Sequence, residues 1–149
     1  MNIYIASSWK NQHAVEMLTS LLRERNHEVW SFVENNYGET NPNAPHAATD
    51  EEGNEMPFEQ WCWSERGRKS FEYDTKGATR ADLVIYLGPS GNDACAELGA
   101  AWASGVPIFG LWAKGEQIGL MRRMMTSWFT NYKRLLESVE LMTRAKAAK

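Results

Sequence analysis

The sequence has no excess of basic residues, because 16 lysines and arginines face 19 aspartates and glutamates, for a net charge of -3. Proteins that neutralise nucleic-acid phosphates need a basic surface, so this balance argues against a general nucleic-acid binder. No apolar run approaches the roughly 20 residues of a membrane-spanning helix. The apolar start, Met1 to Ile5, is expected to form a core strand rather than a signal peptide. We therefore expect partners other than nucleic acid or membrane.

Cysteine and histidine are scarce as well. The two cysteines, Cys62 and Cys95, form neither a disulfide framework nor a metal-ligand pattern, and the three histidines lack metal spacing. There is no Walker A motif, no G-x-G-x-x-G, and no G-x-S-x-G around Ser7. These absences predict no metal site and no hydrolase nucleophile elbow, and they make the reducing cytoplasm the expected location.

What is present is an alternation of strand-like and helix-like segments. Apolar runs predict strands at 3–6, 27–33, 83–87 and 106–112; helical patterns predict helices at about 11–25, 58–80, 94–104 and much of 120–149, with a short edge strand around 127–132. Strands that alternate with helices imply an α/β fold whose mostly parallel sheet is covered on both faces. At 149 residues, the chain fits a single domain over 1–149.

Three features interrupt this pattern. Residues 34–57, rich in Asn, Pro, Gly and acidic side chains, predict a long loop of roughly twice the usual length. Glycines at 67 and 77 are candidate breaks in the 58–80 helix, and residues 144–149 are expected to be a frayed basic tail. Seven tryptophans are many for this length, and several near element ends are candidates for a pocket or an oligomer contact: Trp9, Trp61, Trp63, Trp112 and Trp128.

The stretch from Ser90 to Ala101 is the strongest functional signal. It joins the 83–87 strand to the 94–104 helix through a Gly-containing turn, and free backbone N–H groups at a helix N-terminus favour an anionic ligand. Within the turn, Gly91 is expected to have a positive φ and Asp93 to be the N-cap. Ligands of parallel sheets bind at the carboxyl ends of the strands, which gathers residues 6–9, 88–93 and 112–115 at one edge.

Glu97 is the candidate for chemistry within that stretch. The predicted boundaries place it in the first helical turn, where the macrodipole alone favours an acidic residue. Its neighbours are apolar and small, and the turn before it lies at the predicted ligand edge. Asp74 is a second candidate carboxylate, although a solvated helix charge explains it equally well. Asp82 is expected to cap or end the helix before the 83–87 strand.

Three segments resemble the nucleoside 2-deoxyribosyltransferase superfamily, which includes related nucleotide N-glycoside hydrolases. The start Ile3-Tyr4-Ile5-Ala6-Ser7-Ser8-Trp9 is similar to the family's first strand and substrate loop. Tyr73-Asp74 through Ala81-Asp82-Leu83-Val84 is similar to its aspartate, helix and strand entry. Glu97-Leu98-Gly99-Ala100-Ala101 is similar to the E-x-G-x-A element that holds its glutamate. The resemblance runs from Met1 to about Trp112, apart from the long loop, and implies a flavodoxin-like three-layer sandwich of four or five strands in the order 2-1-3-4-5.

The resemblance also implies roles for these residues. Glu97 would be the nucleophile at the anomeric carbon, giving a covalent glycosyl intermediate, and Asp74 would assist at the base. Ser7, Ser8 and Trp9 would line the base pocket, and the turn Ser90, Gly91, Asn92 and Asp93 would hold the sugar or a phosphate. The substrate would be a nucleoside or nucleotide, with no metal and no cofactor, in a homo-oligomer of two or more subunits.

Two alternatives stay open at this point. The transferases of the family commonly carry an aspartate six residues before the glutamate, where this chain has Gly91, so N-glycosidic chemistry is implied more firmly than deoxyribosyl transfer. A TIR-like NAD glycohydrolase also places a glutamate after a central strand of a flavodoxin-like sheet. A non-enzymatic nucleotide-binding or signalling module would keep its function without Glu97.

Overall fold

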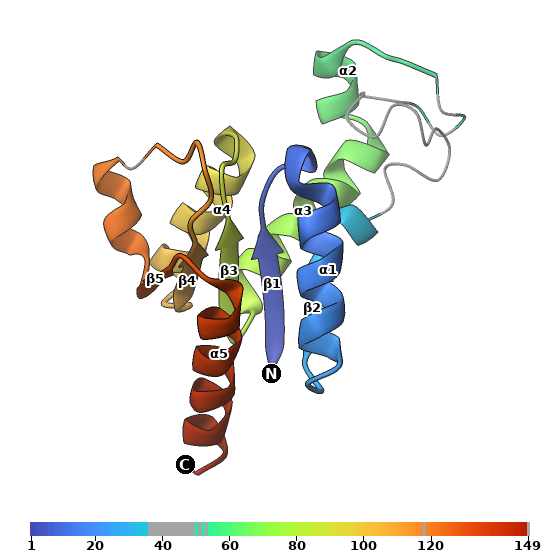
Figure 1. Ribbon diagram of the computed structural model, residues 1–149. Helices are drawn as coiled ribbons and strands as arrows, with labels where there is room; N and C mark the ends of the chain where they lie inside the picture. The colour runs from blue at the N-terminus through green and yellow to red at the C-terminus, as the bar shows by residue number, and fades with distance from the viewer. Residues whose placement is uncertain (36–49, 51, 53, 118, 149) are drawn as a thin grey trace.

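The computed structural model describes residues 1–35, 50, 52, 54–117 and 119–148. Five strands form one sheet in the order β2-β1-β3-β4-β5, and every neighbouring pair is parallel (Figure 1). The strands are β1 (Asn2–Ala6), β2 (Glu28–Ser31), β3 (Leu83–Leu87), β4 (Ile108–Leu111) and β5 (Ser127–Phe129). The predicted α/β class, flavodoxin-like strand order and parallel sheet are therefore confirmed.

Helices cover both faces of this sheet. They are α1 (Gln12–Arg23), α2 (Phe58–Cys62), α3 (Glu65–Arg80), α4 (Asn92–Ala103) and α5 (Tyr132–Ala147), with short 3-10 helices at Trp9–Asn11, Phe32–Glu34 and Leu120–Met124. α1 and α5 lie on one face, and α3 and α4 lie on the other (Figure 1). Within the residues that the structure describes, no helix is long and apolar enough to cross a membrane.

The strand sequences explain these two layers. Side chains alternate between the faces of a strand, so β1 sends Ile3 and Ile5 toward α1 and α5 and sends Tyr4 toward α3 and α4. The central strand β3 is buried along its whole length, which accounts for its unbroken apolar run. The two tyrosines of the central strands, Tyr4 and Tyr86, both lie on the α3 and α4 face and are fully buried.

The predicted break of the 58–80 helix at glycine is wrong. The chain breaks between α2 and α3, where Ser64 Oγ accepts a hydrogen bond of 3.0 Å from the Gly67 backbone N–H and caps α3. Both glycines lie inside α3. Glycine is needed at these two positions because other atoms approach the backbone too closely to leave room for a side chain. A Cβ on Gly67 would lie 2.2 Å from the Trp61 carbonyl oxygen, and one on Gly77 would lie 2.3 Å from the Tyr4 ring.

Two further boundaries differ from the prediction. The C-terminal segment is helical through Ala147, so the tail is not frayed from residue 144, and Lys146 pairs with Asp82. Asp82 does not cap α3, which ends at Arg80 with Ala81 as its C-cap; the Oδ2 of Asp82 instead accepts a 2.8 Å hydrogen bond from the Asn2 backbone N–H. Most of the predicted loop at 34–57 lies outside the described residues.

Candidate active site

The turn after β3 leads into α4 differently from the prediction. Gly91 is the N-cap with a φ of -93°, so the expected positive φ is wrong, and Asp93 lies inside the first turn rather than at the cap. Because α4 begins at Asn92, Glu97 lies in the second turn. The macrodipole effect falls off within the first turn, so it explains an acid at Asp93 but not at Glu97.

Glu97 is held in an environment that disfavours its charge. The pKa of its carboxyl is raised from an ordinary 4.5 to about 9, mainly by burial and also by the nearby charges of Asp74 and Asp93, while a hydrogen bond from Tyr4 acts in the opposite direction. Its Oε2 is buried and has no hydrogen-bond partner among the described residues. An isolated buried carboxyl oxygen costs free energy unless a ligand or a structural partner satisfies it.

Tyr4 connects the two predicted catalytic carboxyls. Its hydroxyl donates a 3.1 Å hydrogen bond to Asp74 Oδ1, although the two residues are 70 positions apart in the chain. Burial raises the pKa of the Tyr4 hydroxyl well above 10, and the negative charges of Glu97 and Asp74 raise it further. The hydroxyl therefore keeps its proton and serves as a hydrogen-bond donor between two acidic groups.

The packing of α3 against Tyr4 positions Asp74 beside the tyrosine hydroxyl. Gly77 lies one turn after Asp74 on α3, and the Tyr4 ring fills the space where a Gly77 side chain would be. This close approach lets the tyrosine ring pass under α3 and bring its hydroxyl to Asp74. The structure thus brings Asp74 and Glu97 together around Tyr4. Their spacing in the sequence does not reveal this proximity.

The loop after β1 lies next to the turn after β3. Ser7 is buried, and its hydroxyl donates a 2.6 Å hydrogen bond to the Leu87 carbonyl. Asn11 Nδ2 donates to Ser7 Oγ at 3.0 Å and to the Pro89 carbonyl at 2.9 Å. These bonds link the carboxyl ends of β1 and β3. The hydroxyl and amide groups of this loop therefore fix the conformation of the sheet edge where a ligand is expected.

The other residues predicted in that loop point to different neighbours. Ser8 caps the first 3-10 helix, with its Oγ 3.4 Å from the Lys10 backbone N–H. The Trp9 ring packs edge-on against Phe32 at 5.1 Å between ring centroids.

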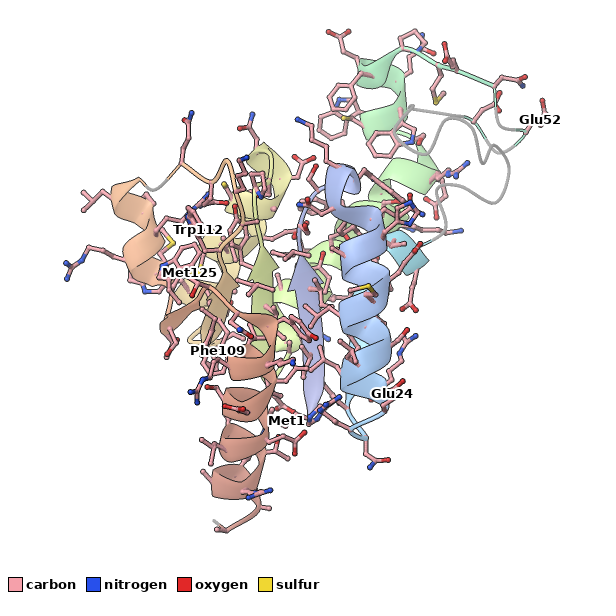
Figure 2. The ribbon with its side chains drawn as sticks, viewed as in Figure 1. Met1, Glu24, Glu52, Phe109, Trp112 and Met125 are labelled. Carbon is pink, nitrogen blue, oxygen red and sulfur yellow. The ribbon has the colours of Figure 1, made fainter. Side chains whose placement is uncertain are left out.

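The other tryptophans near element ends lie in different surroundings. Trp63 is 91% exposed, whereas Trp128 packs edge-on against Tyr86. The labelled Trp112 and Met125 lie on the β4 and β5 side of the sheet (Figure 2).

A second polar cluster surrounds the turn that holds Ser90. The Ser90 hydroxyl lies 2.9 Å from the Tyr86 hydroxyl, which in turn lies 3.0 Å from Glu116 Oε2. Arg122 Nη2 donates to Tyr86 Oη at 3.1 Å and to Glu116 Oε1 at 2.9 Å. Gly91, Asn92 and Asp93 are exposed beside this cluster at the start of α4.

Sequence reasoning missed the residues that organise the site: Tyr4, Asn11, Tyr86, Glu116 and Arg122. One local signal was available, since Tyr4 and Tyr86 are the only side chains with a polar tip in two otherwise aliphatic strand cores, 3–6 and 83–87. A buried tyrosine hydroxyl needs a partner, so each tyrosine indicates a polar group opposite it. The partners themselves come from distant segments and carry no local signal.

A cavity of about 150 Å³ lies on the same face of the sheet, between α3 and the edge of β1 and β2. Its lining includes Tyr4, Gly77, Trp30 and Arg80, but neither Asp74 nor Glu97. It therefore does not define the candidate site.

Comparison with known proteins finds no family model that matches the sequence and no curated protein that resembles it. Solved structures do match. A 2-deoxyribosyltransferase from Bacillus psychrosaccharolyticus is 22% identical, with a TM-score of 0.65 over 91% of this chain and 90% of its own. A CMP N-glycosidase from Clostridium botulinum is 16% identical, with a TM-score of 0.54 over 94% of this chain and 99% of its own.

A conserved protein from Enterococcus faecalis V583 is also similar, with 15% identity and a TM-score of 0.63 over 95% of this chain and 98% of its own. Each of these three matches covers more than nine-tenths of this chain. At such identities they establish the fold alone. The fold expected from the resemblance to the nucleoside 2-deoxyribosyltransferase superfamily is the fold of this chain.

Proposed function

We propose that the protein cleaves or transfers at the N-glycosidic bond of a nucleoside or nucleotide, with Glu97 as the nucleophile. Two observations support the proposal. The fold is shared with a 2-deoxyribosyltransferase and with a CMP N-glycosidase. The residues that carried the sequence resemblance, Asp74 and Glu97, converge on the hydroxyl of Tyr4. N-glycosidic chemistry by a pair of carboxyls needs such a convergence.

The buried, unpartnered Oε2 of Glu97 is the observation that carries the proposal. A carboxyl in this state destabilises the ligand-free protein, and the developing positive charge at an anomeric carbon would offset that cost in the transition state. A merely structural carboxyl would be expected to have a partner for each buried oxygen. The cationic, oxocarbenium-like transition state of glycoside cleavage fits the negative surroundings of this site.

The protonation states of Glu97 and Asp74 determine which carboxyl acts as the nucleophile and which as the proton donor. The raised pKa of Glu97 keeps it protonated at neutral pH in the ligand-free protein, and a protonated carboxyl is not a nucleophile. In the proposed step the Glu97 proton passes to the carboxylate of Asp74. A Glu97 oxygen then bonds to the anomeric carbon as the carbon–nitrogen bond breaks, and Asp74 delivers the proton to the departing base.

The second half-reaction returns the enzyme to its starting state. An acceptor attacks the anomeric carbon, the bond to Glu97 breaks, and Asp74 takes the proton that the acceptor releases. That proton then passes from Asp74 back to Glu97. Water as the acceptor gives hydrolysis, and a second base gives transfer. Tyr4 contributes by donating a hydrogen bond that stabilises negative charge on either carboxyl.

The remaining predicted residues take binding roles in this proposal. Ser8 and Trp9 contact the base, and Ser7 holds their loop through its bond to the Leu87 carbonyl. The turn from Ser90 to Asp93 contacts the sugar end. Leu120 and Met121, 74% and 62% exposed, are candidates for the predicted contact between subunits. Light scattering after size exclusion would test the homo-oligomer.

The decisive experiment is a panel of nucleosides, nucleotides and NAD, monitored by chromatography for the released base. We expect free base from a nucleoside or nucleotide and none with Glu97→Gln. The matched control is Glu137→Gln, which makes the same substitution at an exposed carboxylate of α5. Intact mass spectrometry of the reacting enzyme should also show the added mass of one glycosyl group. Release of nicotinamide from NAD alone would favour the TIR-like alternative, and a product-free panel would favour a binding module.

A further inference from the structure

The cluster behind Ser90 is a closed hydrogen-bonding unit. The Glu116 side chain is 1% exposed, and Arg122, 16% exposed, donates to Glu116 Oε1 from Nε at 3.1 Å and from Nη2 at 2.9 Å. The Arg122 guanidinium also lies over the Tyr86 ring, 4.8 Å from its centroid. There is no space for a side chain at position 88, because a Cβ on Gly88 would lie 1.8 Å from Glu116 Oε2. The geometry of the unit is therefore strongly constrained.

Proton counting assigns a direction to each bond in the unit. Tyr86 has one hydroxyl proton, and its oxygen lies 3.0 and 3.1 Å from the two Glu116 oxygens, which only accept while the carboxylate is paired with Arg122. The Tyr86 hydroxyl therefore uses its only proton to donate a hydrogen bond to the Glu116 carboxylate. Arg122 has only donors, so its 3.1 Å bond to Tyr86 Oη uses one lone pair of that oxygen.

The consequence falls on Ser90. Its 2.9 Å contact with Tyr86 Oη requires a proton, and the proton of Tyr86 is already used, so Ser90 must be the donor. A serine hydroxyl has one proton and two lone pairs. With its proton held by Tyr86, Ser90 has only acceptor capacity left for a ligand.

We propose that Tyr86 fixes Ser90 as a hydrogen-bond acceptor and thereby makes the turn before α4 select a sugar hydroxyl over a 5′-phosphate. This inference rests on the proposed function, in which Ser90 contacts the sugar end of the substrate. A sugar hydroxyl can donate to Ser90, whereas a phosphate at neutral pH offers only acceptor oxygens. The substrate class would then be the nucleoside rather than the nucleotide.

The charges around the turn act in the same direction. Asp93 is exposed in the first turn of α4, and the Asp74 and Glu97 carboxyls lie on the same side of the sheet. The charge of Arg122 is already paired with the Glu116 carboxylate, and four of its five N–H groups donate to Glu116, Tyr86 and Cys95. The backbone amides of the turn donate to either group and do not discriminate.

The test compares kcat/KM for one nucleoside and its own 5′-monophosphate, which share base and sugar. The wild-type protein should prefer the nucleoside. Tyr86→Phe frees the Ser90 proton and should shift the ratio toward the nucleotide by roughly tenfold, the value of about one hydrogen bond. Tyr132→Phe, which removes an exposed hydroxyl at the start of α5, is the control and should leave the ratio unchanged.

Ser90→Ala tests the same inference without disturbing the buried tyrosine, in case Tyr86→Phe does not fold. It should lower kcat/KM for the nucleoside roughly tenfold and change that for the nucleotide little. A wild-type preference for the nucleotide, or a ratio that neither variant moves, would overturn the inference and leave the proposed function standing. Absence of free base from both substrates would overturn the proposed function and this inference with it.

Discussion

Replacing Glu97 by glutamine should abolish turnover and, at the same time, make the protein more stable at neutral pH. Glutamine has nearly the shape of the protonated glutamate side chain, but it has no proton that ionises in this pH range. In the wild-type protein the Glu97 carboxyl is buried near Asp74, and burial raises its pKa to about 9. A group with a raised acid pKa binds its proton in the folded state at pH values where the unfolded chain has released it.

The sign and size of the effect follow from this difference. The unfolded chain binds fewer protons than the folded one between pH 4.5 and 9, so the Glu97 contribution to the free energy of unfolding falls as pH rises through that window. At about 1.4 kcal/mol per pH unit, the 2.5 units between 4.5 and 7 correspond to about 3 kcal/mol. Near pH 5 the same contribution is below about 1 kcal/mol.

Urea unfolding followed by tryptophan fluorescence at pH 5, 7 and 9 measures this directly. At pH 7 the midpoint of Glu97→Gln should exceed that of the wild type by roughly 1–3 M urea, with the difference small at pH 5 and larger at pH 9. Glu137→Gln, which makes the same substitution at an exposed carboxylate of α5, should show no such pH-dependent gain. A Glu97→Gln protein that is no more stable than the wild type at pH 7 would refute the assignment of a strained, protonated carboxyl.

Three further predictions concern the packing and hydrogen bonds of the site. Gly77→Ala should destabilise the fold by roughly 1–3 kcal/mol in thermal unfolding, because its Cβ would overlap the Tyr4 ring, whereas Gly99→Ala, with open space at its Cβ, should stabilise it by roughly 0.5–1 kcal/mol. Tyr4→Phe should lower kcat; because the hydrogen bond from Tyr4 lowers the pKa of Glu97 in the wild-type protein, its loss should raise that pKa and move the corresponding limb of the pH–rate profile to higher pH. Asn11→Ala should cost about 1–2 kcal/mol and raise KM, since it releases the Pro89 carbonyl; an unchanged KM would show that the tie between the loops is not needed.

The sequence predicted those features of the fold that depend on local patterns. The unbroken apolar run at 83–87 was interpreted correctly as a strand, which is the buried central strand β3. Gly67 and Gly77 were not, because a local propensity scale treats a glycine as a helix breaker and cannot see a carbonyl or a ring arriving from elsewhere. The strand order required the resemblance, since periodicity alone does not say which strands are neighbours.

The candidate site shows the same division. Asp74 and Glu97 were singled out by motif, and the structure brings them together at the hydroxyl of Tyr4. Their coupling through Tyr4 was out of reach, because the hydroxyl and Asp74 are 70 residues apart in the chain. Glu116 and Arg122 were missed for a related reason: they follow β4 in a segment without strong periodicity, and only the folded chain places them against Tyr86.

The two buried tyrosines show why one cluster is a candidate for chemistry and the other for support. Tyr4 and Tyr86 lie on the same face of adjacent strands, and each brings a hydroxyl to an acidic side chain. Around Tyr86 the charge of Glu116 is met by Arg122 at 2.9 Å, so the unit is satisfied and resists rearrangement. Around Tyr4 a Glu97 oxygen is left without a partner among the residues described, so the free energy of the site falls when a ligand supplies positive charge. The same arrangement thus gives a satisfied hydrogen-bonding unit around Tyr86 and, around Tyr4, a carboxyl with one unsatisfied oxygen.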